Sequence, residues 1–277
     1  MFRTEMLEYF IVHLNSIEHN YVLALEQNDP EGIHDLRVEL KRMRAFFNLT
    51  ESINPDFDAR RNFKCFRRIS KKTNMLRDTQ IQQKLLEAIK TSVKTDVGEY
   101  DMFLKTKEAD NREIFRILSE NNPLIKLQKK KKVINAALKA ISPVWAETKA
   151  QGRFYNLRND IILLVSTTSS RDIKLHKVRV LAKEIHYCLE IIQKCFFLFP
   201  AAGDFIENIA KMHKILGKWH DYEVGGAFLN EFLETGGKNI PQEPYKQLSD
   251  YMSHEKGELR KAFMPAFDIF KQTALAL

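Results

Sequence analysis

The chain has 277 residues, and 44% of them are hydrophobic, which is enough for a sizeable core in one large domain. With only 10 Gly and 8 Pro, the composition excludes disordered and collagen-like chains and argues against a glycine-rich phosphate-binding loop. The formal net charge of +8 indicates a polyanionic partner.

Helical spacing of apolar residues runs along almost the whole chain, and no segment shows the alternation of a strand. Three Asp/Asn-Pro pairs are typical of helix starts: Asp29-Pro30, Asn54-Pro55 and Asn122-Pro123. The pattern predicts helices over residues 1–27, 31–53, 57–75, 78–97, 101–120, 123–150, 153–166, 171–198, 202–222, 222–235 and 241–272. Pro265 should kink the last helix. We therefore predict an all-α fold.

An internal repeat organises these helices. The segment IHDLRVELKRMRAFF, which begins at Ile33, aligns with LHKVRVLAKEIHYCL, which begins at Leu175. The matched pairs are His34/His176, Arg37/Arg179, Val38/Val180 and Lys41/Lys183. A second echo follows each segment, with Arg77-Asp78 in the first and His220-Asp221 in the second. Residues 1–277 should therefore form a single domain of two similar halves, about 1–150 and about 153–277.

Basic side chains share one face of each repeated helix. At about 100° per residue, one stripe of the first helix holds His34, Arg37, Lys41, Arg44 and Asn48. The opposite, core-facing stripe holds Leu36, Leu40, Met43 and Phe47. The second copy repeats the basic stripe with His176, Arg179, Lys183 and His186. The helices that follow add Lys64, Arg67, Arg68 and Lys71 in the first half, and Lys211, Lys214 and Lys218 in the second.

Charge is concentrated in the first half. Residues 34–77 hold twelve Lys/Arg and five Asp/Glu, an excess of +7. Like charges one turn apart cost a few tenths of a kcal/mol per pair, so a stripe of them favours a bound anion. A single basic stripe would more often be a solvated helix face, but its repetition favours a site. For the run Lys126–Lys132 a solvated face is the preferred interpretation, and extension of an anion-binding track is the alternative.

The pattern His-x-x-Arg-x-x-x-Lys-Arg-x-Arg at 34–44 and its echo at 176–183 resemble the CHAD family, the conserved histidine α-helical domain. The trailing Arg77-Asp78 and His220-Asp221 support that resemblance, which covers residues 5–270 or so. It implies two pseudo-symmetric helical bundles that face each other across a basic cleft or pore and bind inorganic polyphosphate. The residues expected to bind are His34, Arg37, Lys41, Arg42, Arg44, Lys64, Arg67, Arg68, Lys71, His176, Arg179, Lys183, Lys211, Lys214 and Lys218.

The second half departs from the family pattern. Glu184 and His186-Tyr187 stand where the family usually has basic residues and Arg-Tyr, and His220 stands where Arg is common. We therefore expect the first half to dominate the affinity. If His186 and His220 gain charge in mild acid, polyphosphate binding should tighten there.

The residues support an enzymatic function less well than a binding function. His34 and His176 are each flanked by Arg and Lys, which would repel a metal ion, so neither a metal nor another cofactor is expected. The chain has neither the E-x-E-x-K motif of the triphosphate tunnel domain often fused to this family nor a P-loop motif. We predict a protein that is not an enzyme. A nucleic-acid backbone binder using the same cleft and a metal-dependent phosphate-chain hydrolase remain the alternatives.

The cysteines and the apolar stretches indicate the compartment. Cys65, Cys188 and Cys195 form no C-x-x-C motif, so we expect inert thiols in a reducing environment. Charged residues interrupt the N-terminal apolar pattern, so no signal peptide is expected, and no apolar stretch approaches the ~20 residues of a membrane span. We predict a cytoplasmic protein without membrane contact, either free or associated with polyphosphate or polyester storage granules.

Overall fold

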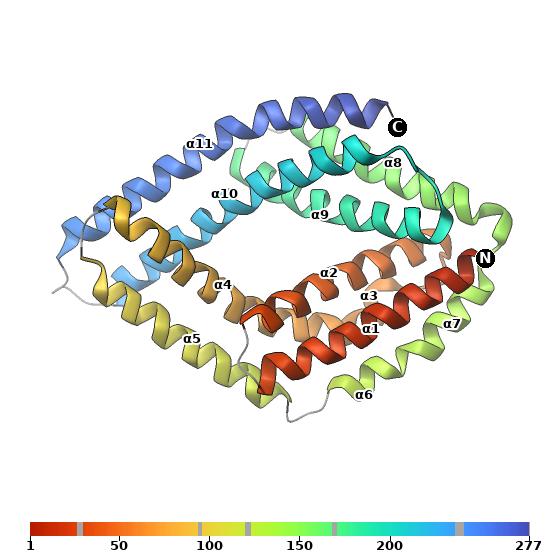
Figure 1. The fold of residues 1–277 in the computed structure, drawn as a ribbon, viewed down its shortest axis with the longest axis horizontal. Coiled ribbons are helices and arrows are strands. Elements are labelled where there is room, and N and C mark those ends of the chain that lie inside the picture. The colour runs from red at the N-terminus through yellow and green to blue at the C-terminus, as the bar shows by residue number, and fades with distance from the viewer. Residues whose placement is uncertain (27–29, 94–95, 120–122, 168–170, 236–240, 277) are drawn as a thin grey trace.

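The computed structural model describes residues 1–26, 30–93, 96–119, 123–167, 171–235 and 241–276 (Figure 1). Every regular element within these residues is a helix, which confirms the all-α prediction. The helices are α1 (Phe2–Glu26), α2 (Pro30–Ile53), α3 (Ala59–Asn62), α4 (Lys64–Val93), α5 (Gly98–Ser119), α6 (Pro123–Gln128), α7 (Lys130–Ala140), α8 (Pro143–Thr167), α9 (Arg171–Phe196), α10 (Gly203–Thr235) and α11 (Gln242–Leu275). Among the described residues, none of these helices combines the length and apolarity that crossing a bilayer requires.

Two predicted helix breaks are absent. α4 runs straight through Arg77-Asp78, and α10 runs straight through His220-Asp221. In α4 the reason is that these side chains face a neighbouring helix instead of capping a helix end. Arg77 reaches His34 of α2, and Asp78 lies beside Arg37 of the same helix.

The helices between residues 123 and 167 are divided differently from the prediction. The expected helix over 123–150 is divided into α6, α7 and the first part of α8, which begins at Pro143. Proline is favoured in the first turn of a helix and cannot continue one, so the chain turns at Ile141-Ser142. α8 is then continuous through residues 150–153, where the break was expected, and α11 continues through Pro265.

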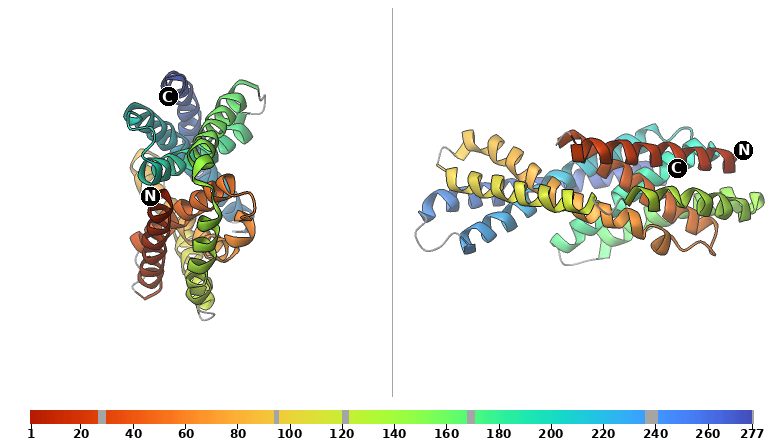
Figure 2. Two further views of the ribbon diagram at one scale, coloured as in Figure 1. Left: turned by 90° about the vertical axis from the view of Figure 1, so that its right-hand side faces the viewer. Right: turned by 90° about the horizontal axis from the view of Figure 1, so that it is seen from below.

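The core has two hydrophobic clusters, and neither belongs to one half of the chain. The larger cluster draws on both repeated helices, for example Phe47 of α2 and Ile185 of α9. The smaller cluster joins the second half of α4 and the start of α5 to the end of α10 and the start of α11. The long helices run broadly along the long axis of the molecule, so α4 and α10 pass from one cluster to the other (Figures 1 and 2).

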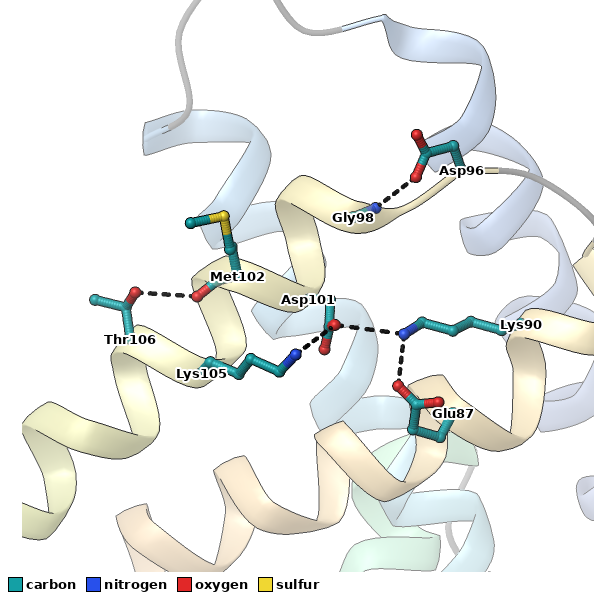
Figure 3. A network of polar contacts seen from close by, with 8 residues as sticks. All are labelled: Glu87, Lys90, Asp96, Gly98, Asp101, Met102, Lys105 and Thr106. Atoms are coloured by element: carbon teal, nitrogen blue, oxygen red, sulfur yellow. Dashed lines mark hydrogen bonds and ion pairs between the residues drawn. The ribbon is translucent and has the colours of Figure 1, made fainter.

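Polar contacts between α4 and α5 brace the smaller cluster (Figure 3). Asp101 of α5 accepts from Lys105, at 2.9 Å, and from Lys90 of α4, at 3.4 Å. The Asp96 side chain accepts from the backbone N–H of Gly98 at 2.9 Å, where α5 begins. Because Lys90 and Lys105 are partly or largely exposed, their ion pairs contribute about 0–1 kcal/mol each, and of the two the Lys90–Asp101 pair joins α4 to α5.

Candidate anion-binding cleft

A cleft of about 630 Å³ separates the two repeated helices, α2 and α9. α3 and α4 form its wall beside α2, and α10 adds to its wall beside α9. Seven of the lining side chains are Lys or Arg: Arg37, Lys41, Arg44, Arg60, Arg67, Arg179 and Lys183. Three carboxylates line it as well: Glu51, Asp78 and Glu184. The cleft therefore carries a clear excess of positive charge.

The helical period explains why these cations face the cleft. On α2, Arg37, Lys41 and Arg44 line the cleft, while Leu36 and Met43 are fully buried on the other side. On α9, Arg179 and Lys183 line the cleft, while Val178, Ala182 and Ile185 are fully buried. Burial of the apolar stripe against the core fixes the rotation of each helix, so the basic stripe must face the gap between them.

Matched residues of the two repeats have matched neighbours. In the first half, the Arg77 guanidinium donates to Nδ1 of His34 at 3.2 Å. In the second half, the ring of His220, the counterpart of Arg77, lies 5.4 Å from the ring of His176. In each half, the first repeated segment (on α2 or α9) thus contacts the second (on α4 or α10). This contact accounts for the joint recurrence of the two segments in the sequence.

Lys41 and Lys183 are buried cations without a carboxylate in ion-pair contact in the described part of the chain. Within the described residues neither forms an ion pair, and both ammonium groups are largely buried. Burial, followed by Arg37 and Arg179, lowers the pKa of Lys41 to about 8. Burial, followed by Lys41 and Arg179, lowers the pKa of Lys183 to about 6. Protonation of these two lysines therefore costs free energy until an anion binds beside them.

The carboxylates of the cleft have partners other than its two lysines. Glu184 is bound by Arg153 and accepts from Asn48 Nδ2 at 2.9 Å, and Glu51 accepts from the backbone N–H of Ala59 at 2.9 Å. Arg37 Nη2 lies 3.8 Å from Asp78 Oδ1, but burial raises the pKa of Asp78. Just outside the lining, burial raises the pKa of Asp221 to about 6. These groups leave the lysines of the cleft unneutralised.

Buried donors and acceptors around the cleft lack partners. Arg179 Nε, His213 Nε2 and His220 Nδ1 are buried, and none has a hydrogen-bond partner among the described residues. Burial, followed by Lys183 for His213 and by Arg179 for His220, lowers the pKa of each histidine to about 3. The prediction that His220 gains charge in mild acid is therefore wrong. Burial also lowers the pKa of His186.

Several predicted binding residues lie outside the cleft. Arg42 pairs with Glu39 at 2.7 Å and with Glu190 at 3.2 Å, so it ties α2 to α9. His34 is exposed and contacts Arg77. Of the binding residues predicted on α4, Lys64, Arg68 and Lys71 are exposed and do not line the cleft.

The predicted binding lysines of α10 also lie outside the cleft. Lys211 and Lys214 line a separate groove of about 320 Å³ against α11, and Lys218 is exposed. On a helix these three positions lie about 120–180° around the axis from His220, which lines the cleft. The prediction that they support the cleft fails because His213 and His220, seven residues apart, occupy the face of α10 turned toward it.

Sequence reasoning missed three polar lining residues, Arg60, Ser70 and Asn74. Asn74 Oδ1 accepts from Arg37 Nη1 at 2.5 Å, so it helps to orient that guanidinium. Ser70 and Asn74 follow Arg67 at helical spacings of three and seven, which places all three on one face of α4. That spacing in the sequence was the signal that could have identified Ser70 and Asn74 as lining residues.

The comparisons with known proteins agree with this arrangement. No curated protein matches the chain. The crystal structure of the CHAD domain from the plant Ricinus communis is similar in fold, with a TM-score of 0.72 and 17% identity over 100% of this chain and 92% of that one. PptA from Streptomyces chartreusis gives a TM-score of 0.62 and 13% identity over 98% of each chain. The CHAD domain family model matches residues 8–230, and the chain therefore belongs to the CHAD family.

Proposed function

We propose that this protein binds inorganic polyphosphate in the cleft between α2 and α9 and does not cleave it. One observation carries the proposal: Arg37, Lys41, Arg179 and Lys183 converge from α2 and α9, and within the described residues Lys41 and Lys183 form no ion pair with a carboxylate. A chain of phosphates offers closely spaced negative oxygens, which accept charge-assisted hydrogen bonds from guanidinium and ammonium groups.

The unpartnered polar atoms support an anionic ligand. A phosphate oxygen could accept from Arg179 Nε, which is otherwise a buried donor without a partner. Leaving such a donor unsatisfied costs about 1–3 kcal/mol, so a ligand that satisfies it gains that free energy. Polyphosphate has no base edges, so the cleft need recognise only charge and phosphate spacing.

Binding without hydrolysis follows from the charge around the carboxylates. Asp78 lies beside Arg37, and Arg179 and Lys183 act on both Asp78 and Asp221. Cations at these positions would repel the divalent metal that phosphate-chain hydrolysis commonly uses. We expect no release of orthophosphate from polyphosphate when the protein is incubated with Mg²⁺ or Mn²⁺.

We further propose that the protein acts in the cytoplasm, on free polyphosphate or on storage granules that carry it.

The test is a calorimetric titration with long-chain polyphosphate at low and high salt. The wild type is compared with Lys41→Glu/Lys183→Glu and with a control of equal charge, Lys149→Glu/Lys246→Glu, whose lysines are exposed on α8 and α11. Lys41→Gln/Lys183→Gln, checked by thermal unfolding, separates loss of binding from loss of fold.

We expect salt-sensitive binding, because bound polyanions release counterions, and we expect it to survive in the control and disappear in the cleft variant. Equal binding by the cleft variant and the control would overturn the proposal. Ready displacement of polyphosphate by duplex DNA would favour nucleic-acid binding instead.

A further inference from the structure

Two segments of the chain carry many cations and no acidic residue. Residues 59–77 contain eight Lys/Arg and no Asp or Glu, and residues 123–146 contain six Lys and no Asp or Glu. In a chain with 36 acidic residues, both segments are unusual. The first forms α3 and the start of α4, and the second forms α6, α7 and the start of α8.

The two segments meet in the fold. α6 packs against α4, and Lys130 Nζ donates to Asn62 Oδ1 at 3.0 Å. Burial raises the pKa of the Cys65 thiol, while Lys130 and Arg68 act on the same thiol in the opposite direction. Lys130 and Arg68 therefore both lie near Cys65, although they come from different segments.

This basic surface is continuous with the cleft. Arg67 lines the cleft, and on the same helix Lys71, Lys64 and Arg68 follow at about 40°, 60° and 100° around the axis. Arg60 also lines the cleft, and its neighbour Arg61 is exposed. The cations thus turn from the cleft wall onto the outside of the molecule, and the nearby carboxylates of Glu51 and Asp58 accept from the backbone N–H groups of Ala59 and Arg61.

None of the outward cations is neutralised within the described part of the chain. We define the outer basic face as Arg61, Lys64, Arg68, Lys71, Lys126, Lys129 and Lys130. No ion pair involves any of them among the described residues, whereas exposed cations elsewhere often have one, such as Lys211 with Glu207 at 2.8 Å. A surface that keeps this charge uncompensated is suited to a polyanion.

We propose that a polyphosphate chain longer than the cleft leaves it past Arg60 and Arg67 and continues across the outer basic face. This inference rests on the proposed function of the cleft and adds a second part to the same binding track. A chain already held in the cleft is presented to the outer basic face at high effective concentration. The second contact can then raise the overall affinity by about 10²–10⁴ without any change in the cleft. The outer basic face would make the protein selective for long chains.

The experiment compares tripolyphosphate, which is short enough for the cleft alone, with long-chain polyphosphate. The variant Lys64→Gln/Arg68→Gln/Lys126→Gln removes three exposed cations that come from both segments. The control Lys149→Gln/Lys246→Gln/Lys271→Gln removes the same charge from exposed positions on α8 and α11. Both are titrated with each ligand at several salt concentrations.

We expect the outer-face variant to lose at least about 10-fold in affinity for the long chain, with a shallower salt dependence. Its affinity for tripolyphosphate should equal that of the control. Equal affinity of variant and control for the long chain would overturn the outer track while leaving the cleft proposal intact. Failure of the cleft proposal gives a different result, because Lys41→Glu/Lys183→Glu would then bind both ligands normally.

Discussion

The two walls of the cleft descend from the same sequence signature but differ in charge. The wall of α2, α3 and α4 contributes five Lys/Arg, whereas the wall of α9 and α10 contributes Arg179 and Lys183. Arg44 of α2, Arg60 of α3 and Arg67 of α4 make the difference. α4 turns Arg67 toward the cleft, whereas α10 turns His213 and His220 toward it, with pKa values lowered to about 3. The first wall therefore supplies four arginines beside Lys41, and the second supplies one arginine beside Lys183, whose pKa is lowered to about 6.

Neutralising the cations of each wall separately should give the largest change in polyphosphate affinity. We expect Arg37→Gln/Lys41→Gln to weaken polyphosphate binding about 100-fold and Arg179→Gln/Lys183→Gln only about 10-fold, since each hydrogen bond to a charged group contributes about 1.5–3 kcal/mol. The α9 pair should matter less because Lys183, with its pKa lowered to about 6, is mostly neutral at neutral pH before ligand arrives. Titration calorimetry at one salt concentration measures both losses. Equal losses would mean that the two walls contribute alike.

The pH dependence of binding should sharpen the comparison. Bound polyphosphate restores the pKa of Lys41 and Lys183 toward the ordinary value of 10.5, so binding takes up protons and the affinity rises as pH falls from about 10 to about 6, with Lys41 contributing above about 8 and Lys183 down to about 6. Protonation of Asp221, with its pKa raised to about 6, acts in the same direction. Calorimetry in buffers of different ionisation enthalpy counts the protons. An affinity that is flat over this range would show that neither lysine titrates on binding.

The ligand-free protein should show the opposite trend in stability. A lysine whose folded pKa is depressed binds fewer protons when folded, so the free energy of unfolding rises with pH between the folded pKa, about 6 for Lys183, and its unfolded value of 10.5. Denaturant unfolding of wild type and Lys183→Met across this range isolates the contribution of Lys183. The slope should be smaller in the variant, and an unchanged slope would contradict the assignment.

Removing the carboxylate beside Arg37 should have a modest effect. Asp78→Asn keeps the shape of the side chain but deletes a negative charge that acts on Arg37, Arg179, Lys41 and Lys183. We expect binding to tighten by about 3-fold to 10-fold, which corresponds to roughly 1 kcal/mol of reduced charge competition. Weaker binding would instead show that Asp78 holds Arg37 in position for the ligand.

The crossing of α4 and α10 joins the two walls, and a change there should affect binding least. A Cβ at Gly225 would lie 2.8 Å from Gln82 Oε1, and Gln82 is buried and donates to the backbone oxygen of Asp221 at 3.0 Å. We expect Gly225→Ala to lower the free energy of unfolding by about 1–3 kcal/mol through overpacking, with little change in affinity. Gly226→Ala is the matched control, because nothing lies within 4 Å of its Cβ and alanine favours a helix. Equal stability of the two variants would contradict the close crossing.

The sequence predicted the repeated helices better than their second partners. Arg37, Lys41, Arg179 and Lys183 could be placed because an apolar stripe lies opposite them on the same helix. On α10 the stripe is less decisive, since apolar residues surround much of the helix, and a count of lysines could not show which face meets α9. Arg42 also carries no local sign that Glu190, 148 positions away, would engage it. Long-range partners of this kind depend on the packing of whole helices.

The division of the core has a consequence for the origin of the repeat. Residues of both halves fill each hydrophobic cluster, so neither half alone could bury its apolar surface. A chain with one copy of this signature would have to associate with a second copy to complete both clusters, placing the cleft on the twofold axis of a homodimer.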